Sequence, residues 1–102
     1  MNENEQKIRE YICEIGYNLW MRGYVAANDG NISVKIAENV FLTTPTGVSK
    51  KNMTPQMLVK MNEKNEVIEC PDGSRPSSEF KMHLSCYRCR PDIKAVVHAH
   101  PP

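Results

Sequence analysis

Ile32-Ser-Val-Lys-Ile-Ala-Glu-Asn-Val-Phe-Leu-Thr-Thr44 is the stretch of this 102-residue chain that decides its fold. Residues 32–36 alternate apolar and polar side chains, as a half-buried strand does, and residues 40–44 form a second run of strand-forming side chains. Asn39 stands between the two runs, where a short polar turn can reverse the chain. This arrangement predicts a β-hairpin, and therefore an antiparallel sheet.

A helix is predicted before the hairpin, over residues 4–22. Its apolar side chains recur at intervals of four and three residues, which places them on one helical face. Gly23 follows as a C-cap, because glycine readily adopts the left-handed conformation that ends many helices. Asn28-Asp-Gly-Asn31 then predicts the turn that leads into the hairpin. The members of the apolar stripe are Ile8, Ile12, Ile15 and Leu19.

The chain after the hairpin changes pattern over short distances. Thr54 and Pro55 suit the N-cap and the first position of a helical turn. A second helix opens with Ser-Ser-Glu, which is a capping signal, and carries apolar side chains at helical spacing. The elements predicted here are strands at 59–62 and 66–69, a helix from 77 or 78 to 89, and a strand at 93–98. Helices flanking a mainly antiparallel sheet make an α+β domain.

Length and composition exclude several classes of protein. The 102 residues allow one small domain, and their 40% hydrophobic and 25% charged content is ordinary for a globular chain. With a formal net charge of +1 and no basic run longer than Lys50-Lys51, no nucleic-acid partner is expected. No apolar run approaches the ~20 residues that span a bilayer. The polar, acidic N-terminus is not a secretory signal, so we expect a cytoplasmic protein with no membrane partner.

Four cysteines are expected to be reduced, because no secretory signal precedes them. Cys86-Tyr-Arg-Cys89 has the C-x-x-C spacing of a redox pair or of half a zinc site, but no second C-x-x-C completes such a site. The pair falls late in the second predicted helix, where residues i and i+3 share a face. We interpret both cysteines as small apolar side chains that pack on that face.

The last segment, Ala95-Val-Val-His-Ala-His-Pro-Pro102, carries the strongest chemical signal. In a strand, residues i and i+2 point to the same side, so His98 and His100 present two imidazoles to one point. Imidazole is a ligand that suits zinc and other first-row divalent metals. Two histidines do not complete a tetrahedral site, so other parts of the chain must supply further ligands.

Glu79 is a candidate for a metal ligand or a general base. It lies at the start of the second predicted helix, and an antiparallel return from this helix could bring it to the end of the H-x-H strand. The alternative is structural, since an acid in the first turn of a helix interacts favourably with the helix dipole. His83 shares a helix face with Glu79 and could support it, although a packed core histidine is the favoured interpretation.

Three short segments combine glycine or small polar residues with free backbone N–H groups. Turns and helix N-termini of this kind bind anions, because their N–H groups converge on one point. Each segment taken singly is more often a structural turn or cap. The residues concerned are Gly30 and Asn31 with Ser33, Thr46 and Gly47, and Ser77 and Ser78.

These motifs together resemble the class II aldolase/adducin-type domains, most closely the L-fuculose-1-phosphate aldolase branch. The resemblance covers nearly the whole chain, and P-S-S-E combined with V-V-H-x-H is its most specific part. It implies a three-layer α/β/α fold of which residues 1–102 form the N-terminal part, with the C-terminal half of the domain absent. The motifs are Gly30-Asn-Ile-Ser33, Thr44-Pro-Thr-Gly47, Arg75-Pro-Ser-Ser-Glu79, His83 and Ala95-Val-Val-His-Ala-His100.

The resemblance also implies roles for particular residues. In that family, the carboxylate of P-S-S-E and both histidines of H-x-H bind zinc, and a histidine well downstream completes the site. The corresponding ligands here are Glu79, His98 and His100, and Glu79 would also act as the catalytic base. The family's phosphate pocket corresponds to Gly30, Asn31, Thr46, Gly47, Ser77 and Ser78.

The implied activity is cleavage of a ketose 1-phosphate, such as L-fuculose 1-phosphate, into dihydroxyacetone phosphate and an aldehyde. Zn²⁺ or another divalent metal would stabilise the enediolate that the cleavage leaves. The alternatives are a sugar-phosphate epimerase or dehydratase of the same family, an adducin-like module without catalysis, and a truncated remnant without turnover. Epimerases of the family usually carry Asp in place of Glu79, and adducin-like modules lack the metal ligands, so the aldolase is favoured.

The resemblance further implies a homo-oligomer, which is a tetramer in the intact family. The strand ending at His98 is apolar on both faces, so we expect it to be central in the sheet of a longer protein. In residues 1–102 alone, that strand would leave an uncovered edge, which favours association. We therefore expect this chain to self-associate or to be only marginally stable by itself.

Overall fold

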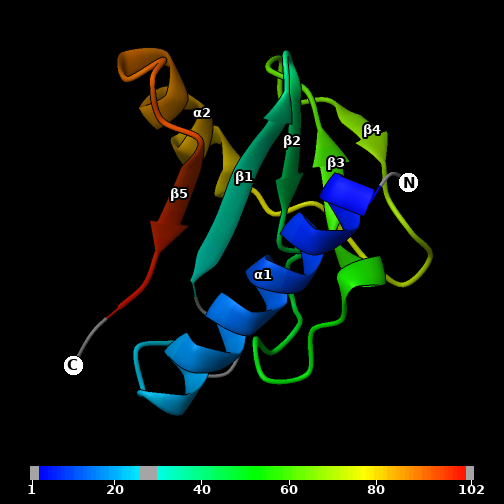
Figure 1. Cartoon of the computed structure of the whole chain (residues 1–102), viewed down its shortest axis with the longest axis vertical. Coiled ribbons are helices and arrows are strands. Elements are labelled where there is room, and N and C mark those ends of the chain that lie inside the picture. The colour runs from blue at the N-terminus through cyan, green and yellow to red at the C-terminus, as the bar shows by residue number, and fades with distance from the viewer. Residues whose placement is uncertain (1–2, 26–29, 101–102) are drawn as a thin grey trace.

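The fold is a sheet covered by one helix on each face, as the computed structural model of residues 3–25 and 30–100 shows (Figure 1). Helix α1 spans Glu3–Met21 and helix α2 spans Phe80–Cys89. The remaining elements of the described residues are β1 (Asn31–Ala37), β2 (Val40–Thr43), the 3₁₀ turn η1 (Pro55–Met57), β3 (Val59–Met61), β4 (Val67–Glu69) and β5 (Ala95–His98). Asn28 and Asp29 of the predicted turn lie outside the described residues.

The five described strands form one sheet in the order β4-β3-β2-β1-β5. Each neighbouring pair is antiparallel, so the predicted α+β fold with a mainly antiparallel sheet is confirmed. The predicted hairpin is β1–β2, and Asn39 takes a φ of 61° at its turn. The short predicted strands around Asn65 form a second hairpin, β3–β4, and Asn65 has a φ of 62°.

The alternation of side chains along the strands divides the core into two layers. Phe41 of β2 packs with α2, whereas the next residue, Leu42, packs with Ile12 of α1 on the opposite face. This alternation explains the three layers, because successive strand residues point to opposite sides of a sheet. The cluster under α2 consists of Phe41, Val59, Met61, Phe80, Leu84 and Tyr87.

The buried face of α1 differs from the predicted apolar stripe. Ile12 is buried, but Ile15 is 40% exposed, and the other buried helix residues are Arg9 and Gly16. The Arg9 guanidinium pairs with the Glu5 carboxylate at 3.0 Å and donates a hydrogen bond to the carbonyl of Pro55. Gly16 lets the helix approach Met53 closely, since a Cβ added there would lie 3.1 Å from Met53 Cε. Contacts with the rest of the fold therefore turn a face of α1 towards the core that is not its most apolar face.

Several predicted boundaries shift by a few residues. Gly23 is confirmed as the C-cap of α1, with a φ of +74° and with Tyr24 N–H donating to the Leu19 carbonyl. Thr54 is at the N-cap position of η1, but its side chain makes no capping hydrogen bond. Helix α2 begins at Phe80 rather than at the serines, because Ser77 to Glu79 form a separate turn.

Two further predictions need correction or qualification. Cys86 and Cys89 are both exposed, so the interpretation that they pack as apolar side chains is wrong. Strand β5 is an edge of the sheet in this chain, and its Val97 is 49% exposed. A central place for β5 in a longer protein stays a prediction.

Neither described helix is long and apolar enough to cross a membrane.

Candidate active site

The register of β1 and β5 builds one wall of the candidate site. Asn31 at the start of β1 is the direct cross-strand partner of His98 at the end of β5. Directly opposed residues of an antiparallel pair have neighbouring side chains on the same face. Sheet pairing therefore places an amide next to an imidazole on the side that α2 covers.

Glu79 reaches these two side chains from the start of α2. It occupies the N-cap position with helical backbone angles, and its side chain makes no capping hydrogen bond. The hydroxyl of Ser77 accepts a hydrogen bond from the Glu79 N–H at 3.2 Å, which fixes the turn before the helix. The carboxylate is thus directed at the sheet, where Oε2 accepts from Asn31 Nδ2 and lies 3.2 Å from His98 Nδ1.

His100 lies beyond the end of β5 but stays beside His98. The two imidazole rings have centroids 4.7 Å apart, and the His100 N–H donates to the Tyr24 carbonyl at 2.8 Å. The structure therefore brings Glu79, His98 and His100 together. In this conformation the Glu79 carboxylate bonds to Asn31 and His98, and the described residues form no group of three or more His, Cys, Asp or Glu arranged to hold a metal ion.

Most of the predicted phosphate-binding residues line a small polar cavity of about 100 Å³ next to this cluster. The cavity wall combines a glycine turn, an amide, three hydroxyl side chains and the Glu79 and His100 side chains, which suits an anion better than an apolar ligand. Gly47 is the exception among the predicted residues, since it does not line the cavity. The lining residues are Gly30, Asn31, Pro45, Thr46, Ser77, Ser78, Glu79 and His100.

Arg75 places a cation next to the Thr46-Gly47 turn, although it does not line the cavity, and it was not among the predicted site residues. Its carbonyl accepts the Thr46 N–H at 3.0 Å, and a Cβ added to Gly47 would lie 3.5 Å from the Arg75 guanidinium. Gly47 has a φ of +75°, so it shapes this turn rather than contacting the cavity. Arg75 directly precedes the P-S-S-E motif, and a positive charge next to a run of neutral donors is the sequence feature that could have indicated it.

His83 and Ser33 lie inside the protein rather than in the cavity. Both side chains are fully buried, and Ser33 Oγ is 2.7 Å from His83 Nδ1 and 2.9 Å from the Tyr87 hydroxyl. The favoured interpretation of His83 as a packed core histidine agrees with this position. Burial, followed by the nearby charge of His98, lowers the pKa of His83 from 6.5 to about 4, while Glu79 acts in the opposite direction.

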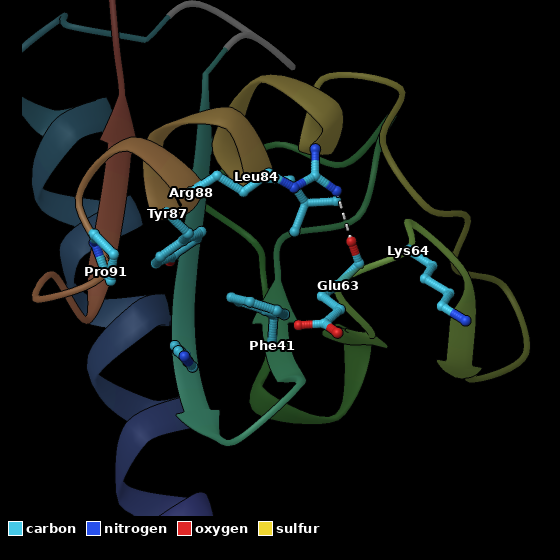
Figure 2. Close-up of a pocket in the computed structure, with 8 residues that line it drawn as sticks. Phe41, Glu63, Lys64, Leu84, Tyr87, Arg88 and Pro91 are labelled. Atoms are coloured by element: carbon cyan, nitrogen blue, oxygen red, sulfur yellow. Dashed lines mark hydrogen bonds between the residues drawn. The ribbon is translucent and has the colours of Figure 1, made fainter.

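A second, larger cavity of about 480 Å³ lies apart from this cluster, between α2 and the β1–β2 and β3–β4 hairpins (Figure 2). Figure 2 shows Tyr87 and Leu84 of α2 facing Phe41 of β2, with the charged side chains of Glu63 and Arg88 beside them. Arg88 closes one side by donating to the Glu63 carbonyl at 2.8 Å. Three of the residues that line the cavity, Phe41, Leu84 and Tyr87, belong to the core under α2, and none of the candidate catalytic residues lines it.

Comparison with known proteins identifies the family. The profile of the Class II Aldolase and Adducin N-terminal domain matches residues 10–102. This chain belongs to the class II aldolase and adducin family. The resemblance predicted from its motifs is therefore confirmed, and a solved L-fuculose 1-phosphate aldolase shares the fold with a TM-score of 0.82 and 30% identity over 93% of this chain and 44% of its own.

Individual members of the family are similar over nearly the whole chain. The 3-oxo-tetronate 4-phosphate decarboxylase of Escherichia coli strain K12 is 38% identical over 94% of this chain and 44% of its own length. The 5-deoxy-D-ribulose 1-phosphate aldolase of Bacillus thuringiensis serovar kurstaki is 40% identical over 95% and 45%. The solved structure of YgbL from Escherichia coli has a TM-score of 0.89 at 36% identity, covering 98% and 47%. This class II aldolase-type chain thus spans less than half the length of these relatives.

Proposed function

We propose that this chain carries the substrate-phosphate site and part of the metal site of a carbon–carbon lyase that acts on a phosphorylated sugar. The observation that supports this most is the contact of the Glu79 carboxylate with Asn31 and His98, beside a polar cavity. An acid held between an amide and an imidazole can accept and return a proton at the reacting carbon. The neighbouring hydroxyl and N–H donors can hold a phosphate at a fixed distance from that acid.

The names of the relatives favour two reactions that share one intermediate. Cleavage of a ketose 1-phosphate between the α-carbon and the β-carbon of its carbonyl group, on the side away from the phosphate, releases an aldehyde and leaves the enediolate of dihydroxyacetone phosphate. Loss of carbon dioxide from 3-oxo-tetronate 4-phosphate leaves the same enediolate, because the carboxylate departs from the carbon beside the carbonyl. Aldol cleavage is the function we propose first, since it is the activity that the motifs imply and an aldolase relative is 40% identical. Decarboxylation is the second candidate, and a decarboxylase relative at 38% identity supports it.

The donor set of the cluster fits a divalent metal of the kind that the family resemblance implies. Two imidazoles and one carboxylate are ligand types that zinc accepts, and His98, His100 and Glu79 are the residues that would hold it. The metal would supply Lewis-acid stabilisation of negative charge on the substrate oxygens.

The side chains of this protein carry out the remaining steps. Asn31 donates to the Glu79 carboxylate and so holds its Oε2 in place. In the cleavage direction Glu79 takes up the proton that the substrate β-hydroxyl gives up as the aldehyde forms, and it delivers this proton to the enediolate carbon, which completes dihydroxyacetone phosphate. The reverse direction runs the same transfers backwards. Ser77, Ser78 and the Thr46 turn bind the phosphate, whose binding energy orients the reacting carbons.

A product assay tests the proposal and separates its two candidates. The protein is incubated with Zn²⁺ and with either 5-deoxy-ribulose 1-phosphate or 3-oxo-tetronate 4-phosphate, and dihydroxyacetone phosphate is followed through its NADH-dependent reduction by an added dehydrogenase. We expect product from the ketose phosphate together with an aldehyde. Product from the oxo acid alone would favour the decarboxylase, and no product from either would contradict lyase activity of this chain. Glu79→Gln identifies any product that comes from a contaminating enzyme.

Replacing Ser78 with alanine should weaken phosphate binding modestly. Loss of one hydrogen bond costs ~0.5–1.5 kcal/mol, which corresponds to a two- to twelve-fold weaker affinity. Titration of the folded protein with inorganic phosphate by NMR measures this change. Ser85→Ala is the matched control, because Ser85 is exposed on α2 and, among the residues that the structure describes, its hydroxyl donates only to the Lys81 carbonyl of its own helix. If the phosphate affinity of Ser78→Ala equals that of Ser85→Ala, Ser78 does not bind the phosphate.

A further inference from the structure

Polar side chains of α2 meet β1 at two successive levels. Glu79 contacts Asn31, and one helical turn later His83 contacts Ser33. Four helical residues advance about 6 Å and two strand residues about 6.6 Å, so the two contacts repeat in step along helix and strand. The position of α2 along β1 that forms one contact therefore also forms the other.

The second level is a closed network at the centre of the α2 layer. Ser33 and His83 are fully buried, and the Tyr87 hydroxyl, 2.9 Å from Ser33 Oγ, is almost as deep. Tyr87 also belongs to the core cluster against which Val96 of β5 packs, two residues before His98. The network thus connects the three elements that carry Asn31, Glu79 and His98.

Packing alone does not account for a histidine at this position. His83 Nε2 is buried and has no hydrogen-bond partner among the described residues. A leucine of similar volume would fill the same space without a polar atom to satisfy, and buried polar groups favour a specific arrangement over greater stability in some proteins. What the histidine adds over leucine is the directional hydrogen bond between its Nδ1 and Ser33 Oγ.

We propose that His83 is a positioning residue for Glu79. Through Ser33 and Tyr87 it fixes the translation and rotation of α2 on β1 and β5, and this fixes the Glu79 carboxylate against Asn31 and His98. The proposal rests on the proposed function in giving Glu79 a role at the reacting carbon and at the metal. The Asn31–Glu79 contact that the positioning role explains is present in the structure whether or not Glu79 has these two roles.

The test compares two replacements of His83 with a variant that destabilises the other face of the sheet. His83→Leu removes the bond to Ser33, whereas His83→Asn keeps a polar atom near the position of Nδ1. Leu58→Ala opens the core under α1, because Leu58 belongs to the cluster on that face. The first readout is the pair of Asn31 side-chain amide signals by NMR in metal-free protein, and the second is zinc affinity by calorimetry of the folded fraction.

We expect His83→Leu to move the Asn31 amide signals towards those of Glu79→Gln and to weaken zinc binding about 10-fold or more, as loss of a residue that orients a ligand does. His83→Asn should restore both readouts, and Leu58→Ala should lower the melting temperature while leaving both unchanged. Asn31 signals that stay unchanged in His83→Leu would overturn the positioning role. If wild type binds no zinc but the signals move as expected, the positioning role holds and the metal part of the proposed function fails.

Discussion

Gly30→Ala should be the most damaging single substitution near the candidate site. Gly30 has a φ of +86°, and a Cβ there would lie 2.5 Å from Val25 Cγ1 and 2.9 Å from the His98 carbonyl oxygen. The backbone strain costs ~1–2 kcal/mol and the overpacking ~1–3 kcal/mol, so we expect a total loss of about 2–5 kcal/mol. For a domain of this size, thermal unfolding should move down by about 10 °C or more.

Gly73→Ala separates the two causes. Gly73 has the same φ of +86°, but a Cβ there would meet no atom within 4 Å. This variant should therefore lose only the ~1–2 kcal/mol of strain. Equal melting temperatures for the two variants would show that Val25 and His98 do not press on Gly30. Because His98 lies at that contact, Gly30→Ala should also weaken phosphate and zinc binding of the fraction that stays folded, and Gly73→Ala should not.

Acidification should destabilise the protein between about pH 6.5 and pH 4 through His83. Its pKa is lowered from 6.5 to about 4 in the fold, chiefly by burial, so the unfolded chain binds the proton more readily. The stability that the neutral His83 provides is complete above pH 6.5 and is lost as the pH falls towards 4. At 1.36 kcal/mol per pKa unit, the loss approaches about 3 kcal/mol.

Chemical denaturation at several pH values, with a chelator present, measures this loss. His83→Asn replaces the imidazole with an amide that does not titrate, and it should remove most of the slope. Glu5 makes a separate contribution, because hydrogen bonds from Lys60 and Arg9 outweigh its burial and lower its pKa below 4.5. Its stabilisation is lost only below pH 4.5, and it should persist in His83→Asn. An equal slope in wild type and His83→Asn would show that His83 is not the group responsible.

Local sequence patterns predict much of this fold because their causes are local. The two hairpins follow from alternation and from asparagine turns, and Gly23 ends α1 through its own backbone freedom. The buried face of α1 could not be predicted in this way, because Arg9 is buried only where Glu5 and the Pro55 carbonyl meet its charge. Those partners come together only in the tertiary fold.

In the candidate site, too, local patterns predict some features, and others depend on the tertiary fold. Spacing alone places His98 beside His100, and the turn at Ser77 to Glu79 places the acid at a helix start. The spacing does not reveal that the Ser33 side chain points into the core towards His83. A polar side chain on a strand is expected to be exposed when the helix that covers it is unknown. The exposure of Cys86 and Cys89 depends in the same way on how α2 is rotated against the sheet.

Zinc-edge X-ray absorption of the protein loaded with one equivalent of Zn²⁺ tests the central claim most directly. A site made by Glu79, His98 and His100 predicts a first shell of nitrogen and oxygen at ~2.0–2.2 Å, with the multiple scattering of imidazole. His98→Ala and His100→Ala should each remove imidazole scattering. A sulfur shell at ~2.3 Å would place the metal at cysteine side chains instead and would contradict the account, as would an unchanged spectrum in both histidine variants.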